Sequence, residues 1–318
     1  MQIDVFNGDA DGMCALHQLR MAKPVESKLV TGIKRDINLL SRVSAGKGDH
    51  ITVLDISLDK NRDPLLVLLN AGVSIQYFDH HFSGEIPEHV NLQAYIDTQP
   101  TVCTSLLVND VLSGRYLSWA VTAAFGDNLF DSARNAASSL HLSADELEQL
   151  KILGTCLNYN GYGAALEDLF YHPADLYRKI KPYLNPFDFI LSDEAYKVLS
   201  EGYQEDMAKA SAIKPEYESA HAAVYILPDE KWARRVSGVY SNDLAQNNPD
   251  KAHAVLTLKG TGEFQVSVRA PITIKTGADS LCRKFETGGG REAAAGINAL
   301  PSDAVDKFVT IFLMHFSN

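Results

Sequence analysis

The first hundred residues alternate between short apolar runs and segments whose apolar positions recur at helical spacing. A helix is predicted from Gly12 to about Met21, and another begins at Asp63-Pro64 and ends at Gly72, because glycine favours helix ends. Strands are predicted at five places, residues 2–6, 28–32, 50–55, 73–78 and 92–96. This alternation predicts a mostly parallel sheet covered by helices.

The pattern becomes mostly helical over residues 104–183. Ser143 opens one of these helices, with Glu146 three residues later, which is the spacing of a capping box. Residues 181–187 contain two prolines and break the pattern. A helix over about residues 192–213 follows, and it could connect two domains.

A second α/β pattern begins near His221. Strands are predicted at residues 222–227, 252–259 and 263–270, and helices near 232–246, 279–286 and 301–316. We therefore expect an α/β protein with an N-terminal, mostly parallel sheet covered by helices, and a smaller C-terminal α/β domain joined by a helical linker. The predicted boundaries are 1–190, 191–215 and 216–318.

Composition agrees with two domains, because 318 residues are about twice a typical domain length. The hydrophobic fraction of 46% and the charged fraction of 22% are ordinary for globular proteins. The net charge of −11 argues against stable binding to duplex DNA, which needs a basic surface. Small phosphorylated ligands fit this charge better, because bound divalent cations would reverse its sign locally.

The chain contains no apolar run near the roughly 18 residues that predict a membrane span, and no signal peptide is apparent. Its cysteines are widely spread and form no CxxC pair, which favours reduced thiols over a zinc site or disulfides. We expect a cytoplasmic protein without membrane contact. The four cysteines are Cys14, Cys103, Cys156 and Cys282.

Acidic and imidazole side chains follow three of the predicted strands. Because binding sites in open α/β sheets form beyond the carboxyl ends of the strands, we expect these side chains to meet in one crevice that holds a pair of divalent cations. Each one taken alone is also explained by a turn or a helix cap. The residues are Asp9 and Asp11 after the first strand, Asp55 after the third, and Asp79-His80-His81 after the fourth, with Asp127 as a further candidate between two helices.

As a set, the order Asp-x-Asp, Asp, Asp-His-His, Asp resembles the DHH phosphoesterase superfamily. The C-terminal third adds to this resemblance. Gly288, Gly289, Gly290 and Arg291 look like the glycine-rich loop of the DHH-associated substrate domain. Arg269 ends a stretch that resembles the preceding strand, which in this family carries a substrate-facing arginine.

The resemblance implies a DHH metal-binding catalytic domain over 1–190 and a DHH-associated substrate-binding domain over 216–318. It also implies two ions, with manganese favoured by the mixed nitrogen and oxygen donors and magnesium possible. The implied roles are Asp55 bridging both ions, Asp9 on one ion, and Asp11, His80 and Asp127 on the other. His81 would contact the scissile phosphate or orient a ligand, and Asp79 would be a ligand or a hydrogen-bond acceptor.

Three positions depart from the family pattern. Val5 stands where many relatives have a histidine, and Asn7 stands where an aspartate is common in the RecJ-like spelling of this motif. We therefore expect weak or substrate-dependent occupancy of one metal site, completed by Asn7, water or substrate. Arg291 replaces a histidine that often follows the three glycines, and its guanidinium suits a terminal phosphate or carboxylate.

Other positions carry weaker signals. Residues 157–163 either stack on a nucleobase or end a helix with buried tyrosines. Thr104 and Ser105 either line the crevice or begin a helix. Arg234 and Arg235 are expected on a solvated helix face.

We expect a manganese-dependent phosphodiesterase that hydrolyses short oligonucleotides or linear or cyclic dinucleotides by a two-metal mechanism. One alternative is a RecJ-like single-strand exonuclease. Another is a catalytically reduced nucleotide-binding regulatory protein, suggested by Val5 and Arg291, and a phosphoanhydride hydrolase is less favoured. A short oligonucleotide or dinucleotide is the expected partner, and a homodimer is possible.

Overall fold

The computed structural model describes residues 1–317. The chain divides into two compact units, Met1–Glu201 and Gly202–Asn318, and the boundary lies inside helix α9 (Glu194–Ser211). Each unit has its own sheet and its own hydrophobic core.

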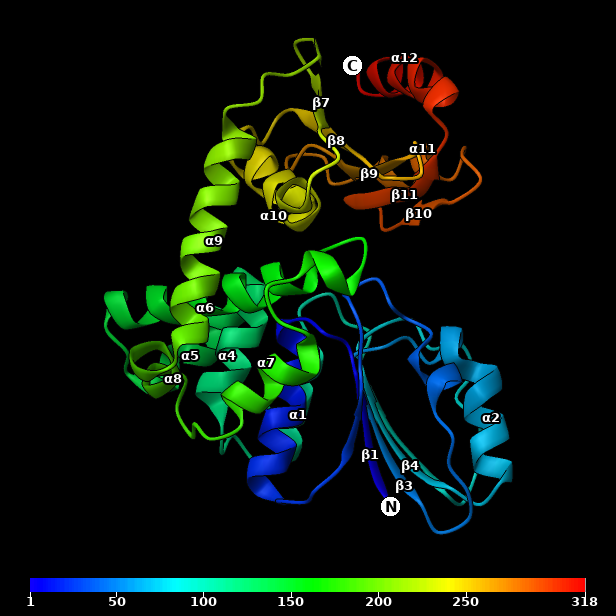
Figure 1. Ribbon diagram of the computed structural model, residues 1–318, viewed down its shortest axis with the longest axis vertical. Coiled ribbons are helices and arrows are strands. Elements are labelled where there is room, and N and C mark those ends of the chain that lie inside the picture. Colours follow the sequence, from blue (N-terminus) through cyan, green and yellow to red (C-terminus); the bar gives the residue numbers. More distant parts are fainter. Residues whose placement is uncertain (318) are drawn as a thin grey trace. The chain divides into compact units, whose positions relative to one another are not determined.

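The first unit is built on a sheet of five parallel strands in the order β2-β1-β3-β4-β5 (Figure 1). The prediction of a mostly parallel sheet is therefore confirmed. Because all strands run in one direction, their carboxyl ends lie along a single edge. The strands are β1 (Gln2–Phe6), β2 (Lys28–Val30), β3 (His50–Leu54), β4 (Ser74–Asp79) and β5 (Leu92–Ile96).

Side chains alternate between the two faces of this sheet. Ile3, Val5 and Val53 point to one face, where they join a buried apolar cluster with leucines of helix α2. Figure 1 shows α2 on one face of the strands and α1 on the other. On the α1 side, Arg20 pairs with the fully buried Asp4, so an ion pair fixes this helix to β1.

Eight helices precede α9 in the first unit. They are α1 (Ala10–Ala22), α2 (Arg62–Asn70), α3 (Thr104–Val111), α4 (Leu117–Gly126), α5 (Phe130–Ala137), α6 (Ala144–Gly161), α7 (Pro173–Ile180) and α8 (Pro186–Ser192). The predicted capping box is present, since Ser143 and Glu146 satisfy each other's backbone at the start of α6. Helices α4 and α6 approach closely at Gly154, where a Cβ would lie 2.1 Å from the Thr122 carbonyl oxygen.

The structure corrects two predictions in this unit. The second strand ends at Val30 rather than near residue 32. Residues 186–192 form helix α8, whereas the prolines of residues 181–187 predict only a break in the helical pattern. Asn185 caps α8 by accepting from the Phe187 amide at 3.0 Å, and Pro186 occupies its first turn, where a missing N–H has no consequence.

The second unit contains a six-stranded sheet in the order β10-β11-β9-β8-β7-β6, in which β7 and β8 are parallel and the other pairs are antiparallel. Helices α10 and α12 lie on opposite faces of this sheet (Figure 1). The elements are β6 (Tyr217–Glu218), β7 (Ala222–Leu227), α10 (Lys231–Asn247), β8 (Ala252–Leu258), β9 (Phe264–Arg269), α11 (Ala278–Cys282), β10 (Gly288–Gly290), β11 (Ala294–Leu300) and α12 (Val305–His315).

Four features of the second unit differ from the prediction, and the first is strand β6, which had not been predicted. Helix α11 ends at Cys282, four residues before the expected end. The three glycines form strand β10 instead of a loop, and β11 had not been predicted at all. Glycine and alanine have low intrinsic strand propensity, so these strands depend on pairing with each other and with β9. Among residues 1–317, the helices are too short or too polar to span a bilayer.

His17 offers a test of the core of the first unit. Its ring is 1% exposed, its Nε2 donates to the Tyr183 carbonyl oxygen at 2.8 Å, and burial lowers its pKa to about 4. Because the folded pKa lies below the unfolded value near 6.5, the unfolded chain binds a proton first as the pH falls. The stabilisation is therefore complete above about pH 6.5 and is lost progressively toward pH 4.

We expect His17 to lower the free energy of unfolding by about 2 kcal/mol between pH 7 and pH 5. Urea denaturation at both pH values, for the wild type and for His17→Gln, isolates this contribution from that of the carboxylates. His221→Gln, at an exposed position, is the control. If the wild type and His17→Gln differ in free energy of unfolding by the same amount at both pH values, His17 is not the source of the pH dependence.

Candidate metal centre

The turn between β1 and α1 places two aspartates at the edge of the first sheet. Asp9 caps α1, with one carboxylate oxygen accepting from the Gly12 amide at 3.1 Å. A Cβ at Gly12 would lie 2.3 Å from the Asn7 carbonyl oxygen, so this close turn requires glycine. Asp9 therefore caps helix α1, as the local sequence suggested, and also lies in the site.

Asp11 is held by the first turn of helix α3. Its two carboxylate oxygens accept from the backbone amides of Thr104 and Ser105, each at 2.7 Å. These amides have no partner within their own helix, and a helix N-terminus favours negative charge. Thr104 and Ser105 therefore begin the helix and also contact the site.

Asp55 follows β3 in an unusual backbone conformation. Its φ of 59° lies in the left-handed region, which aspartate tolerates better than most residues but which is still unfavourable. The side chain is buried, and the Thr104 hydroxyl donates to it at 3.3 Å. Backbone strain at a buried carboxylate is typical of functional positions.

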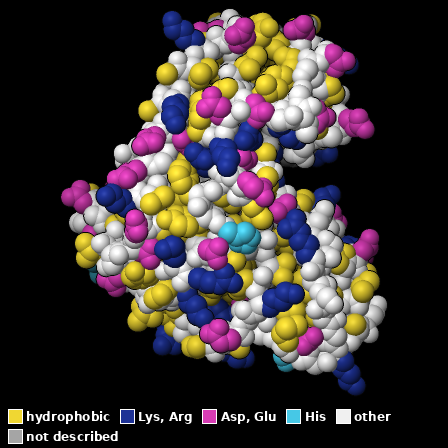
Figure 2. All heavy atoms as spheres, in the orientation of Figure 1, with side chains coloured by type: hydrophobic (Ala, Val, Ile, Leu, Met, Phe, Trp, Pro, Cys, Tyr) yellow, Lys and Arg dark blue, Asp and Glu magenta, His cyan; other side chains and the backbone are white. Residues whose placement is uncertain are grey.

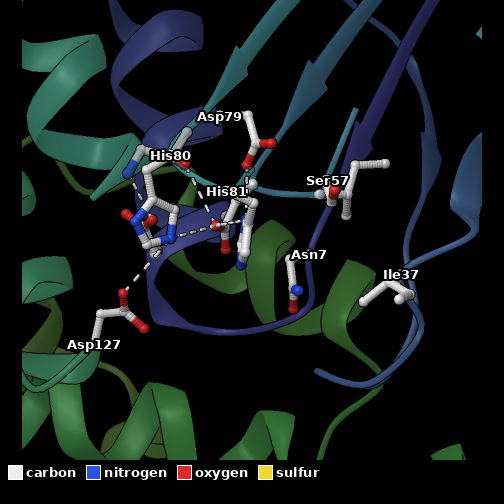
Figure 3. Close-up of polar contacts among 12 residues, drawn as sticks. Asn7, Ile37, Ser57, Asp79, His80, His81 and Asp127 are labelled. Carbon is white, nitrogen blue, oxygen red and sulfur yellow. Dashed lines mark hydrogen bonds and ion pairs between the residues drawn. The ribbon is translucent and has the colours of Figure 1, made fainter. Parts of the chain in front are cut away.

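His80 joins the carboxylates through one ring nitrogen. Its Nδ1 donates to the Val102 carbonyl oxygen at 2.8 Å, which leaves Nε2 facing the acidic groups. Nε2 lies 3.4 Å from Asp55 Oδ1 and 3.7 Å from Asp127 Oδ2 (Figure 3). Asp127 sits at the C-terminal end of α4, where a negative charge is unfavourable, so helix stability does not explain it.

The pKa values at this site show carboxylates crowded in a buried space. Burial, together with the charges of Asp9 and Asp11, raises the pKa of Asp55 well above its usual value. Burial also raises the pKa of Asp11. Burial alone would lower the pKa of His80, but the surrounding aspartates, Asp55 first, raise it to about 10. A cation bound among these groups would relieve the repulsion between them.

Two overlapping groups of side chains have ligand atoms within 4.8 Å of one another, and His80 belongs to both. They combine carboxylate oxygens with an imidazole nitrogen, which suits a divalent cation such as manganese or magnesium and not one that prefers thiolates. The first group is Asp11, His80 and Asp127, and the second is Asp55, His80 and His81.

Asp79 contacts His81 and belongs to neither group. Its Oδ1 lies 2.8 Å from His81 Nδ1, and the carboxylate is fully buried (Figure 3). This pairing fixes the orientation of the His81 ring, whose side chain is 37% exposed. Asp79 is therefore placed to orient His81, and its other carboxylate oxygen is buried without a hydrogen-bond partner.

Lys34 is the main residue that the sequence did not identify. It lies beyond β2, and its Nζ is 2.6 Å from Asp9 Oδ2 and 2.8 Å from Asn158 Oδ1. Asn7, expected among the ligands, donates from Nδ2 to the Lys34 carbonyl oxygen at 3.2 Å, and its buried Oδ1 has no hydrogen-bond partner. Lys34 follows a parallel strand, as the aspartates do. This position beyond the carboxyl end of a strand is the sequence signal that could have identified it.

Residues 157–163 end helix α6 at Gly161, and Tyr159 is buried. The segment reaches the site through Asn158 and through Tyr162, whose ring centroid lies 5.6 Å from Lys34 Nζ. A separate cavity of about 610 Å³ lies near the amino ends of the same strands, lined by residues including Gln2, and contains none of the site residues.

The residues predicted to bind substrate in the second unit lie on neighbouring strands. Arg269 ends β9, pairs in register with Ala294 of β11, and donates from Nε to Asn242 of α10 at 2.7 Å. Arg291 is exposed in the tight turn between β10 and β11. Gly290, with φ of 147° and Ala295 Cα within 2.5 Å of a Cβ position, is required there.

The expectation for Arg234 and Arg235 was wrong. Arg235 pairs with the nearly buried Asp206 at 2.7 Å, and its own side chain is 12% exposed. Arg234 pairs with Asp229. Both guanidiniums thus bind within the second unit and do not form a solvated face.

Comparison with solved structures identifies the fold. The chain matches exonuclease RecJ bound to manganese with a TM-score of 0.65 and 15% identity, over 100% of this chain and 90% of the other. RecJ from Thermus thermophilus in complex with Mn²⁺ gives 0.63 and 15%, over 99% and 52%. PggH from Vibrio cholerae, a pGpG-specific phosphodiesterase, gives 0.58 and 15%, over 99% and 98%. The chain has the fold of these proteins.

This fold is thus shared along the whole chain at low sequence identity. No protein-family model matches the sequence, and a search of curated proteins finds no match. In this fold the aspartates, His80 and His81 all come from the carboxyl edge of the first sheet and the helices beside it.

His80→Ala tests the centre directly. Removing the one nitrogen common to both groups should weaken Mn²⁺ binding by at least about 10-fold, because even the loss of supporting contacts at metal sites costs 10- to 100-fold in affinity. Isothermal titration of metal-free protein measures this, and His221→Ala, at an exposed position in the second unit, is the control. Unchanged Mn²⁺ affinity in His80→Ala would exclude His80 from the centre.

Proposed function

We propose that this protein is a divalent-cation-dependent phosphoesterase that hydrolyses phosphodiester bonds in short nucleic acids or dinucleotides. The observation that carries the proposal is the convergence of Asp11, Asp127 and Asp55 on His80 Nε2 at the carboxyl edge of a DHH-fold sheet. Such a cluster would be electrostatically unfavourable unless a cation bound there.

Manganese is the proposed cation, with magnesium as a possible substitute. The donor set of carboxylate oxygens and one imidazole nitrogen fits it, and the similar RecJ structures are described as manganese-bound. A divalent cation at this position would supply a water of lowered pKa and would neutralise charge on the phosphate.

The side chains around the cation have distinct roles in this proposal. The α3 amides hold Asp11, and the Val102 carbonyl oxygen holds the His80 ring with Nε2 toward the centre. His81, oriented by Asp79, presents its partly exposed ring beside Asp55 and would contact the scissile phosphate. Each group is thus positioned before substrate binds, which lowers the reorganisation needed during the reaction.

Short substrates fit the surface better than long duplexes. On the face in Figure 2, lysines and arginines are interspersed with acidic and apolar side chains and form no continuous basic stripe. The net charge of −11 agrees with this. Arg269 and Arg291 of the second unit are the proposed contacts for the remaining phosphate or the end of the substrate.

A RecJ-like single-strand exonuclease is the second candidate. The Asp9-Ala10-Asp11-Gly12 spelling preceded by Asn7 favours it, as does the similarity to RecJ. The similarity to PggH, described as specific for pGpG, favours dinucleotides. A nucleotide-binding protein with reduced catalysis remains the alternative outside enzymes.

Turnover with Mn²⁺ should be highest for linear dinucleotides, because the proposed substrate contacts suit a short molecule. A panel of linear and cyclic dinucleotides, longer single strands, 3′,5′-bisphosphonucleosides and pyrophosphate, ranked by kcat/KM, measures this preference. Equal release of mononucleotides from long single strands would support the exonuclease instead. Binding without turnover across the panel would support the regulatory protein.

Asp79→Asn should lower kcat by about 10- to 100-fold with little change in KM, because a neutral amide holds the His81 ring less firmly. Steady-state kinetics on the best substrate of the panel measure the two constants separately. Asp97→Asn, just beyond the end of neighbouring β5, makes the same change outside the site and should leave both constants unaltered. A change confined to KM would show that Asp79 acts in binding alone.

A further inference from the structure

Lys34 places a positive charge inside the candidate metal centre. Its Nζ lies among three oxygen atoms from three different elements, at 2.6 Å from Asp9 Oδ2, 2.8 Å from Asn158 Oδ1 and 3.4 Å from Asp127 Oδ1. Carboxylate and amide oxygens are the ligands that hard divalent cations prefer. The ammonium group therefore occupies a position that would otherwise suit a metal ion.

The backbone of Lys34 is fixed on both sides. Its amide donates to the Gly161 carbonyl oxygen at 2.8 Å, and its carbonyl oxygen accepts from Asn7 Nδ2 at 3.2 Å. An aspartate side chain at position 7 would have no N–H to donate to the Lys34 carbonyl oxygen. The asparagine of this chain is therefore suited to holding Lys34. The side chain is 23% exposed, and its ammonium group forms ion pairs with Asp9 and Asp127.

Asp9 has no oxygen left free of contact. Oδ1 accepts from the Gly12 amide, and Oδ2 accepts from Lys34. Asp9 belongs to neither group of metal-binding side chains among residues 1–317. Val5, at the position where many relatives have a histidine, is buried among apolar side chains and offers no ligand.

The remaining groups describe one ion and not two. Both include His80, whose Nδ1 donates to Val102, so only the Nε2 lone pair is free to bind a cation.

We propose that Lys34 replaces one of the two cations of the DHH fold, so that this centre holds a single divalent ion beside a built-in ammonium. This inference rests on the proposed function and departs from the two-ion expectation of the sequence. Asp9 binds the ammonium, and Asp11, Asp55, His80 and Asp127 are the donors left for the single ion.

The test is the number of Mn²⁺ ions bound per chain, measured on metal-free full-length protein by titration with detection of free Mn²⁺ by electron paramagnetic resonance. The wild type should bind one ion. Lys34→Met should bind a second, weaker ion, because Asp9, Asn158 and Asp127 lose their cationic partner. Lys34→Arg keeps the charge and should bind one.

Lys28→Met makes the same substitution at an exposed position of β2 and should also bind one ion. Two tightly bound ions in the wild type would overturn the inference and leave the proposed function standing. A Lys34→Met protein that is folded by circular dichroism and still binds only one ion would also overturn it. One ion in the wild type and two in Lys34→Met, without turnover on any substrate of the panel, would contradict the proposed function alone.

Discussion

Mutual repulsion among buried carboxylates is the constraint on which the site depends. A parallel sheet brings the ends of β1, β3 and β4 to one edge, so aspartates that follow these strands are forced into a small volume. The fold offsets this repulsion with the free amides of α3, the His80 ring and the Lys34 ammonium. The α3 amides contact Asp11, the His80 ring lies near Asp55 and Asp127, and the Lys34 ammonium pairs with Asp9 and Asp127.

The helical part of the first unit is as important to the centre as the sheet. Asp127 ends α4 and Asn158 lies in α6, and these helices touch where Gly154 meets Thr122. The close approach brings two polar side chains, 31 positions apart in sequence, to the same ammonium. A larger residue at position 154 would separate the helices and with them the two oxygen donors.

Asn7, which departs from the common aspartate of the RecJ-like motif, contacts Lys34. A side-chain amide can donate to the Lys34 carbonyl oxygen, whereas an ionised carboxylate can only accept. The neutral residue at position 7 and the cation at position 34 therefore suit each other. In the proposed centre, Lys34 would supply part of the positive charge and a bound ion would supply the rest.

The sequence by itself determined the five strands of the first unit, strands β7, β8 and β9 of the second, the capping box at Ser143 and the residues that follow the strands. These features depend on local periodicity and local capping. Tertiary structure alone decided that β10 and β11 are strands, since their glycines and alanines need a partner strand. It also decided that Arg235 binds Asp206 and that Lys34 enters the metal centre. Contacts between distant segments leave no periodic signal, so only the folded chain shows which charges face each other.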